Sequence, residues 1–301
     1  MQTRFLNKSF FISLIALVSL NAKAQQPISY QQEIADWDKS RVAYLLSPEG
    51  WVNLEGLFWL KPGKNAFGSG AGNELVYKHA SFPELAGNFV WDNGQVTWVS
   101  DSNADVRIND SVITKAVIFE EGKPAPLLSL GTFRWNIIKR EDRIGVRFRD
   151  LESHALKKFK GISRYAVNEE WRLLAHLETA PQASVFITNV LGQINAEPTP
   201  GKLVFTIGGQ MYKLDAIIEG GQLFILFGDA TSGKETYPTG RFLYARQPDE
   251  NGNTILDFNK AFNPPCAFSG YGTCPLPPKQ NILPIAVTAG EKDYAPEGHK
   301  Q

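Results

Sequence analysis

The segment from Leu256 to Glu291 constrains the fold of this 301-residue chain more than any other. It contains both cysteines, Cys266 and Cys274, and six prolines, at positions 264, 265, 275, 277, 278 and 284. Proline restricts φ and has no N–H, so most of this segment is incompatible with a helix interior or a central strand. We therefore expect a long, rigid loop, and loops of this kind commonly carry binding or catalytic residues.

The first 24 residues have the pattern of an export signal. Arg4 and Lys8 precede an apolar run from Phe10 to Leu20, and Ala22-Lys23-Ala24 supplies a small-x-small cleavage pattern. An uncleaved membrane anchor is the alternative, but the apolar run is short for one. We expect residues 1–24 to be removed and the protein to be periplasmic or secreted, with no membrane span after cleavage.

The charge balance argues against nucleic acid as a partner. The whole chain has 31 basic and 31 acidic residues, and three of the basic ones lie in the expected signal. The remaining chain is therefore slightly acidic, which gives no electrostatic footprint for nucleic acid or an anionic membrane. Oligomeric state and cofactors are not predicted by these features.

Alternation and turn residues predict a mainly β protein. Ser29 to Ser47 is the exception, because a capping-box pattern followed by helically spaced apolar residues predicts a helix. Asn93-Gly94 lies between two apolar runs, as in a type I′ hairpin. Arg143 to Arg149 alternates apolar and basic side chains, as a strand does. Many such short strands separated by turns predict sandwiches or barrels.

The order of turns and strands between residues 54 and 140 resembles the forkhead-associated sandwich. The chain departs from that family where phosphothreonine is read, because Ser69 stands where an arginine is expected and residues 82–85 replace the Ser-x-x-His element. The resemblance thus implies a fold and not phosphopeptide binding. We predict an N-terminal helix over 25–50, a forkhead-associated-like β-sandwich over 51–140, a C-terminal β-barrel or sandwich over 141–295 and a tail over 296–301.

Two common chemical motifs are not supported. Gly228 to Lys234 has the spacing of a phosphate-binding loop, but Glu235 occupies the position that needs Ser or Thr, and the context is β. The four histidines are scattered and none has zinc-like spacing, so no metal site is predicted from them.

The two cysteines are predicted to form a disulfide. An oxidising compartment favours a bridge between Cys266 and Cys274, and so short a loop would gain about 2–3 kcal/mol from closure. A catalytic thiol and a cysteine-bound metal are the alternatives that remain open.

Short motifs along the chain resemble one uncharacterised family. They are Gly50-Trp51, Gly56-Leu57-Phe58-Trp59-Leu60, Gly63, Asn65, Phe67, Gly68, Arg147, Asp150, Phe159, Gly161, Asp229, Thr231, Thr236-Tyr237, Gly240-Arg241, Asp257-Phe258-Asn259, Asn263 to Cys266, Cys274 to Pro278, Asn281 and Gly290-Glu291. On these residues the chain resembles the bacterial and archaeal family called domain of unknown function 1684. The resemblance implies kinship and no particular activity.

Our first hypothesis is a small-molecule site in the C-terminal β unit, with hydrolysis of an ester, amide or glycosidic bond as the simplest chemistry. The candidate catalytic residues are Asp257, Arg241, Tyr237 and Asp229. The candidate ligand-binding residues are Asn259, Asn263, Asn281, Glu291, Arg147 and Asp150. Arg241 could instead form a structural ion pair, and Arg147 with Asp150 could be part of a solvated strand face. A non-catalytic binding module and a cysteine-based metal protein are the other hypotheses, so whether the protein is an enzyme stays undecided.

Overall fold

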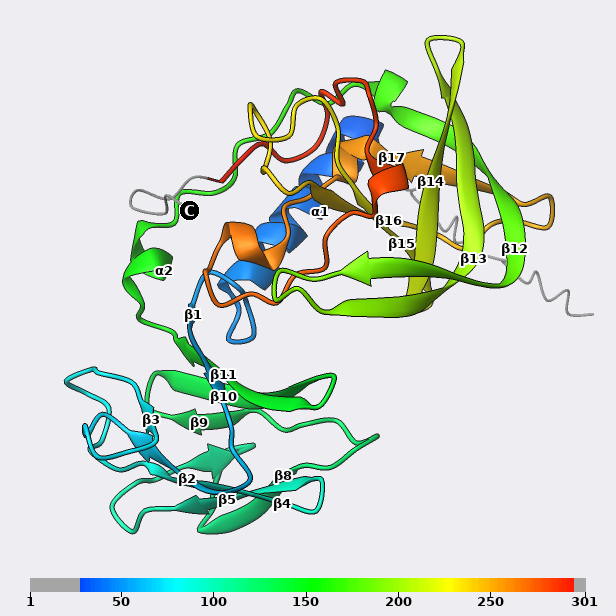
Figure 1. The fold of residues 1–301 in the computed structure, drawn as a ribbon. Coiled ribbons are helices and arrows are strands. Elements are labelled where there is room, and N and C mark those ends of the chain that lie inside the picture. The colour runs from blue at the N-terminus through cyan, green and yellow to red at the C-terminus, as the bar shows by residue number, and fades with distance from the viewer. Residues whose placement is uncertain (1–27, 295–301) are drawn as a thin grey trace, which may run out of the picture.

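A computed structural model describes residues 28–294 (Figure 1). It begins with helix α1 (Tyr30–Leu46), whose N-cap Ser29 accepts a hydrogen bond from the backbone N–H of Gln32 at 3.2 Å. The predicted helix is therefore confirmed, while the predicted signal segment lies outside the described residues. Over residues 28–294, helix α1 and the shorter helical turns lack the length and apolar character needed to span a bilayer.

The N-terminal β unit is a sandwich of two sheets. One sheet has the order β1 (Leu54–Trp59), β11 (Arg143–Asp150), β10 (Phe133–Arg140), β9 (Leu128–Leu130), β6 (Arg107–Ile108), β7 (Ser111–Val112). The other has the order β3 (Leu75–Val76), β2 (Gly63–Gly68), β4 (Gly87–Asp92), β5 (Gln95–Ser100), β8 (Lys115–Phe119). Aromatic rings join the sheets: Phe67 of one lies 6.0 Å from Trp135 and 5.3 Å from Phe148 of the other, measured between ring centroids. Rings packed in this way supply much of the buried apolar area of a small sandwich.

The hairpin predicted at Asn93-Gly94 joins β4 and β5. Both residues have positive φ, +47° and +76°, as the mirror-image turn of a tight hairpin requires. Its register places Phe89 opposite Trp98, and both side chains are buried in the sandwich core.

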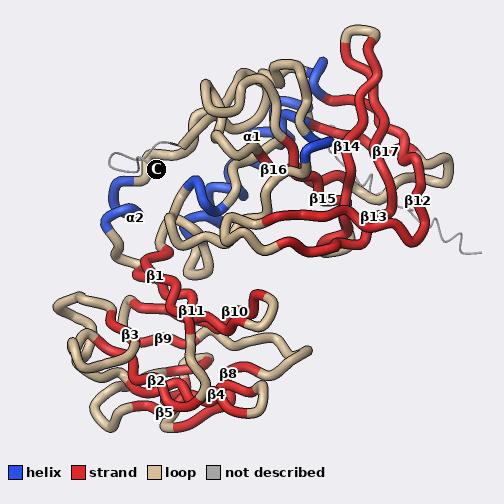
Figure 2. The backbone as a smooth tube through the Cα atoms, viewed as in Figure 1, coloured by secondary structure: helices blue, strands red, loops and turns tan. Residues whose placement is uncertain are grey.

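The C-terminal β unit is built on a second six-stranded sheet (Figure 2). Its order is β16 (Arg241–Ala245), β15 (Gln222–Phe227), β14 (Gln210–Glu219), β13 (Ile194–Ile207), β12 (Arg172–Thr188), β17 (Asn253–Asp257). Short helical segments accompany it: α2 (His154–Lys158), η1 (Glu169–Trp171), η2 (Phe258–Lys260), η3 (Pro265–Ala267) and η4 (Lys279–Asn281). After β17 the proline-rich segment is a loop interrupted by single helical turns. The strands of the two β units confirm the prediction of a mainly β chain.

The chain passes between the two β units twice. Helix α1 packs on the C-terminal unit, because the hydroxyl of Tyr30 donates to Asp257 at 2.7 Å, and β1 then carries the chain to the other unit (Figure 1). Strand β11 pairs with both β1 and β10, so the first sheet runs to Asp150 and not to the predicted 140. We propose placing the boundary after Asp150. Alternation identified β11 as a strand but could not show which strand it pairs with.

Candidate functional site

Asp229 and Arg241, two of the candidate catalytic residues, form a fully buried ion pair. Arg241 Nη2 lies 2.8 Å from Asp229 Oδ2, and the guanidinium also donates to the carbonyls of Val287 and Ala289. Asp229 Oδ1 accepts hydrogen bonds from the N–H and hydroxyl of Thr231. Burial lowers the pKa of Arg241, and the Asp229 carboxylate opposes that shift. These contacts tie the turn after β15 to the C-terminal segment.

Asp257 and Asn259 form a second cluster, beneath the start of α1. Asp257 Oδ1 accepts from the hydroxyl of Tyr30 at 2.7 Å and from the N–H of Asn259 at 3.1 Å. Asn259 Nδ2 donates to the carbonyl of Asn168 at 2.8 Å. Burial and the hydrogen bond to Asp257 raise the pKa of Tyr30, so this hydroxyl stays a donor. The cluster joins the first helix to the end of β17.

Glu291 and Asn263 form a third cluster with two arginines. Glu291 is fully buried. Its carboxylate accepts hydrogen bonds from the N–H of Asn263 at 2.7 Å and from Nε of Arg41 at 3.2 Å. It also forms an ion pair with Arg164, whose Nη1 lies 3.9 Å away. Burial raises the pKa of Glu291 despite these cations. Asn281 lies outside these three clusters, and its side chain forms hydrogen bonds with the backbone of Asp215 and Leu226.

The remaining candidates do not complete a single site either. Tyr237 is buried in the apolar cluster near the disulfide. Arg147 and Asp150 lie three positions apart on β11, and residues an odd number of positions apart on a strand face opposite sides. Asp150 therefore faces His79, 3.9 Å away, in a different hollow from Arg147. The sequence motifs thus mark several buried clusters and not one constellation.

A cleft of about 550 Å³ lies where the two β units meet. Residues from both units line it, and most of them were not predicted from the sequence. They are Trp37, Ser40, Arg41, Tyr44, Trp51, Arg140, Arg147, Glu219, Phe224, Phe242, Tyr244, Phe262, Pro265, Thr273, Cys274 and Pro275. Pockets of this size hold small ligands.

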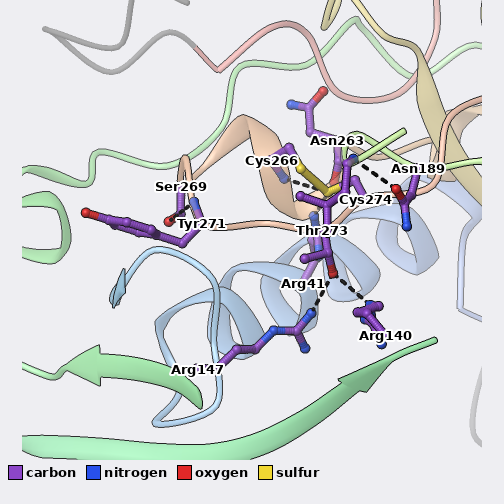
Figure 3. The surroundings of a disulfide bond; sticks show 11 residues. Arg41, Arg140, Arg147, Asn189, Asn263, Cys266, Ser269, Tyr271, Thr273 and Cys274 are labelled. Carbon is purple, nitrogen blue, oxygen red and sulfur yellow. Dashed lines mark hydrogen bonds between the residues drawn. A yellow bond between two sulfur atoms is a disulfide. The ribbon is translucent and has the colours of Figure 1, made fainter. Parts of the chain in front are cut away.

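Two arginines of the N-terminal unit point into the cleft and share one hydroxyl (Figure 3). Arg140 Nε donates to Thr273 Oγ1 at 2.9 Å and Arg147 Nη2 donates to the same oxygen at 3.3 Å. Nε of Arg147 is buried and has no hydrogen-bond partner among the described residues. Neither arginine forms an ion pair within residues 28–294. The guanidinium of Arg147 also lies 4.7 Å from the ring centroid of Trp51.

The electrostatics of Arg147 reflect this lack of an anionic partner. Burial, with the charges of Arg140 and Arg149 acting in the same direction, lowers the pKa of Arg147 to about 9. Arg143, four residues earlier on the same face of the strand, is exposed and stacks 3.8 Å from the Trp59 ring centroid. Arg143 is thus a solvated part of this strand face, whereas Arg147 is largely withdrawn from solvent.

The rest of the lining is aromatic, with a third arginine and a single carboxylate. Arg41 of α1 stacks 4.6 Å from the ring centroid of Phe262 and is held by Glu291. Tyr244 donates its hydroxyl to Glu219, which is the one carboxylate among the described lining residues. Burial, and then this hydrogen bond, raise the pKa of Tyr244. Three arginines against one carboxylate give the cleft a positive lining.

The predicted disulfide is present and shapes this cleft. Cys266 and Cys274 are bonded, with Cα atoms 6.2 Å apart, and Thr273 is the residue immediately before Cys274. Neither cysteine is a free thiol, so the alternatives of a nucleophile or a metal ligand find no support. Within the described chain, no group of three or more His, Cys, Asp or Glu side chains is placed to hold a metal ion.

Sequence reasoning found Arg147 but missed its neighbours. Trp51 lies in one of the family-like motifs, and Thr273 immediately precedes Cys274. The available signal was therefore adjacency in the sequence to a residue already singled out. Arg41 and Arg140 carry no such signal, because a single arginine on a helix or strand is usually solvated. Whether Arg41 and Arg140 line a cleft depends on which surfaces of the two β units meet.

Comparison with known proteins supports kinship and leaves activity open. Residues 157–292 match the family described as protein of unknown function (DUF1684), which confirms the predicted resemblance over that part of the chain. No curated protein matches.

Three solved structures show limited similarity. An uncharacterised protein of Haloarcula marismortui, solved by solution NMR, is 28% identical, with 48% of this chain and 80% of that chain covered and a TM-score of 0.39. The FHA domain of FhaA, in complex with the intracellular domain of Rv3910, is 14% identical (31% and 97% covered, TM-score 0.22). A chain from work on phosphothreonine-dependent FHA domain interactions is 13% identical (31% and 92% covered, TM-score 0.22). These TM-scores are too low to support a statement about shared function.

Proposed function

We propose that this chain is an exported protein that binds a small organic anion, a carboxylate or phosphate, in the cleft between its two β units. The observation that carries the proposal is the pair of guanidinium groups of Arg140 and Arg147, which share one neutral hydroxyl and have no carboxylate partner within residues 28–294. The disulfide favours an oxidising compartment, in line with the signal expected at residues 1–24.

The physical reason is the unmet hydrogen-bonding capacity of Arg147. A guanidinium has five N–H donors, and a buried donor without an acceptor costs about 1–3 kcal/mol. The Thr273 hydroxyl meets a small part of this capacity and supplies no negative charge. A carboxylate or phosphate bound by both arginines would accept hydrogen bonds from each of them and offset part or all of their charge.

The aromatic walls indicate an organic ligand more than a bare ion. Trp37, Trp51, Phe224 and Phe242 present apolar surface beside the arginines. Ligand sites typically combine such surface with a few polar anchoring groups. The anion would therefore be the polar end of a larger molecule.

Isothermal titration calorimetry with benzoate, glucuronate and inorganic phosphate tests the proposal. We expect saturable binding of at least one probe, weakened about tenfold or more by Arg147→Met, which corresponds to about 1.4 kcal/mol. Arg143→Met is the matched control, because Arg143 lies on the same strand and is exposed outside the cleft. Absence of binding by all three probes, or equal affinity of wild type and Arg147→Met, would overturn the proposal.

Hydrolysis of the bound anion is a second candidate function, favoured by one observation. Glu219 is a solvent-exposed carboxylate at the cleft, hydrogen-bonded by Tyr244, and it could act as a general base that takes a proton from a water molecule attacking an ester, amide or glycosidic bond. Chromogenic nitrophenyl glucuronide, which carries a free carboxylate, serves as the probe. The hydrolase proposal requires Glu219→Gln to abolish turnover while anion binding persists; turnover equal to wild type would refute it.

A further inference from the structure

A second hollow, of about 700 Å³, adjoins the cleft. The two share three lining residues: Trp37, Tyr244 and Phe262. The stacked rings of Tyr244 and Phe262, 5.8 Å apart between centroids, are common to both. An elongated ligand could thus extend from one hollow to the other across aromatic surface.

Asp257 lines this second hollow and has one carboxylate oxygen without a hydrogen-bond partner among the described residues. The residue is 5% exposed and lines the hollow. Its Oδ1 atom is occupied by Tyr30 and Asn259, whereas Oδ2 is buried and has no hydrogen-bond partner among the described residues. Lys260 Nζ forms an ion pair with Oδ2 at 3.8 Å, a distance too long for a hydrogen bond. Buried polar atoms are nearly always paired, so a donor supplied by a ligand would complete this site.

The charges around Asp257 indicate a neutral donor. The described residues that line the hollow include three cations and three carboxylates: Arg172, Arg246, Lys260, Glu33, Asp249 and Asp257. Their formal charges cancel, in contrast to the positive cleft. An ammonium donor at Asp257 Oδ2 would be repelled by the positive charge of Lys260, whereas a neutral hydroxyl would not be repelled.

We propose that the two hollows together bind an acidic oligosaccharide. Its carboxylate would lie on Arg140 and Arg147, and its neutral sugar units would extend past Trp37 and Tyr244 so that a hydroxyl donates to Asp257. Sugar rings carry hydroxyl groups at their edges and apolar C–H groups on their faces, which suits alternating polar groups and aromatic rings. This proposal rests on the anion site proposed above and adds the substrate class.

Calorimetry with three sugars tests the ligand class. Glucuronate presents the anion alone, xylotetraose the neutral chain alone, and aldotetraouronic acid, a xylotriose that carries one methylglucuronate, presents both. We expect aldotetraouronic acid to bind about tenfold or more tightly than either of the other two.

The position of the neutral units is tested by Asp257→Asn. We expect this variant to lose most of the added affinity for aldotetraouronic acid while its affinity for glucuronate equals that of wild type. Since Asp257 also holds Tyr30, thermal denaturation checks the fold of the variant. Saturation-transfer NMR on the wild type is a second measurement, in which the xylose protons should receive saturation from the aromatic rings.

The outcomes separate the two proposals. Arg147-dependent binding of glucuronate that aldotetraouronic acid does not exceed would overturn the oligosaccharide proposal and leave the anion site intact. Xylotetraose binding as tightly as aldotetraouronic acid would overturn the oligosaccharide proposal, because the carboxylate would then contribute nothing, while the anion site is judged by glucuronate and Arg147→Met. Xylose protons without saturation transfer would also reject the second hollow as a sugar site.

Discussion

Arg241 and Arg147 are both withdrawn from solvent, yet within residues 28–294 only Arg241 has a carboxylate partner. Arg241 has the carboxylate of Asp229 at 2.8 Å and backbone carbonyls around it. Arg147 has a shared hydroxyl and an aromatic ring in place of a carboxylate, while each of the two arginines has a buried Nε without a hydrogen-bond partner among the described residues. Both residues belong to family-like motifs, so the sequence did not separate them.

The difference suggests a criterion for telling a structural arginine from one proposed to bind a ligand. A buried charge that is paired and hydrogen-bonded stabilises a unique loop conformation, and removing its partner is costly. A charged side chain that lines a cleft and has no anionic partner lacks the ion pair that would stabilise it most. The predictions below test this contrast, from the largest expected effect to the smallest.

Replacing Arg241 should damage the fold most. Arg241→Met leaves Asp229 buried without a cation, and we expect the free energy of unfolding to fall by about 3–5 kcal/mol in urea denaturation. The double variant Arg241→Met with Asp229→Leu is the matched control and should recover much of this loss, since no buried charge remains. A loss below about 1 kcal/mol in the single variant would contradict a structural role.

Removing the disulfide should have the next largest effect. Cys266→Ser with Cys274→Ser frees a loop that the bridge closes over eight positions, which predicts a loss of about 2–3 kcal/mol in the free energy of unfolding. Anion affinity should fall as well, because Thr273 would no longer be fixed beside the arginines. Calorimetry of the same variant decides the second point, and unchanged affinity would mean that the bridge does not position the cleft.

Thr273→Val should have a moderate effect. The change keeps the shape of the side chain and removes the acceptor that Arg140 and Arg147 share, so we expect a loss of about 1–2 kcal/mol in unfolding free energy. Anion affinity should fall less than in Arg147→Met. The variant should therefore lie between wild type and Arg147→Met in a titration, and affinity as low as that of Arg147→Met would show that the hydroxyl itself binds the ligand.

Arg147→Met should change stability least. The substitution removes a charge without an anionic partner and keeps the apolar stem beside Trp51, so we expect unfolding free energy within about 0.5 kcal/mol of wild type, or higher. Thermal denaturation without ligand is the measurement. A large loss would place Arg147 with Arg241 as a structural residue and would remove the contrast.

Local features of the fold were predictable from the sequence. The Ser29 cap and the periodic apolar residues after it specify α1, and Asn93-Gly94 specifies a hairpin, because these depend on residues a few positions apart. The proline-rich loop and the bridge between Cys266 and Cys274 follow from residue type in the same way. None of these features required knowledge of the partner surfaces.

The candidate site was predictable only in part, because its residues come from distant segments. The sequence motifs contained Arg147 and Cys274, but grouped Arg147 with Asp150, which the alternation of β11 places on the opposite side. They also placed Asp229, Arg241 and Asp257 together, whereas Asp257 belongs to a different buried cluster from the Asp229–Arg241 pair.

By itself, the sequence determined the β character of the chain, its first helix, its tight turns and its crosslinked loop. Tertiary structure decided that α1 packs on the C-terminal unit, that β11 closes the first sheet, and that Arg41, Arg140, Arg147 and Thr273 meet in one cleft. The reason is physical: turns and caps are stabilised by neighbours in the chain, while contacts across long loops are selected by the packing of whole surfaces.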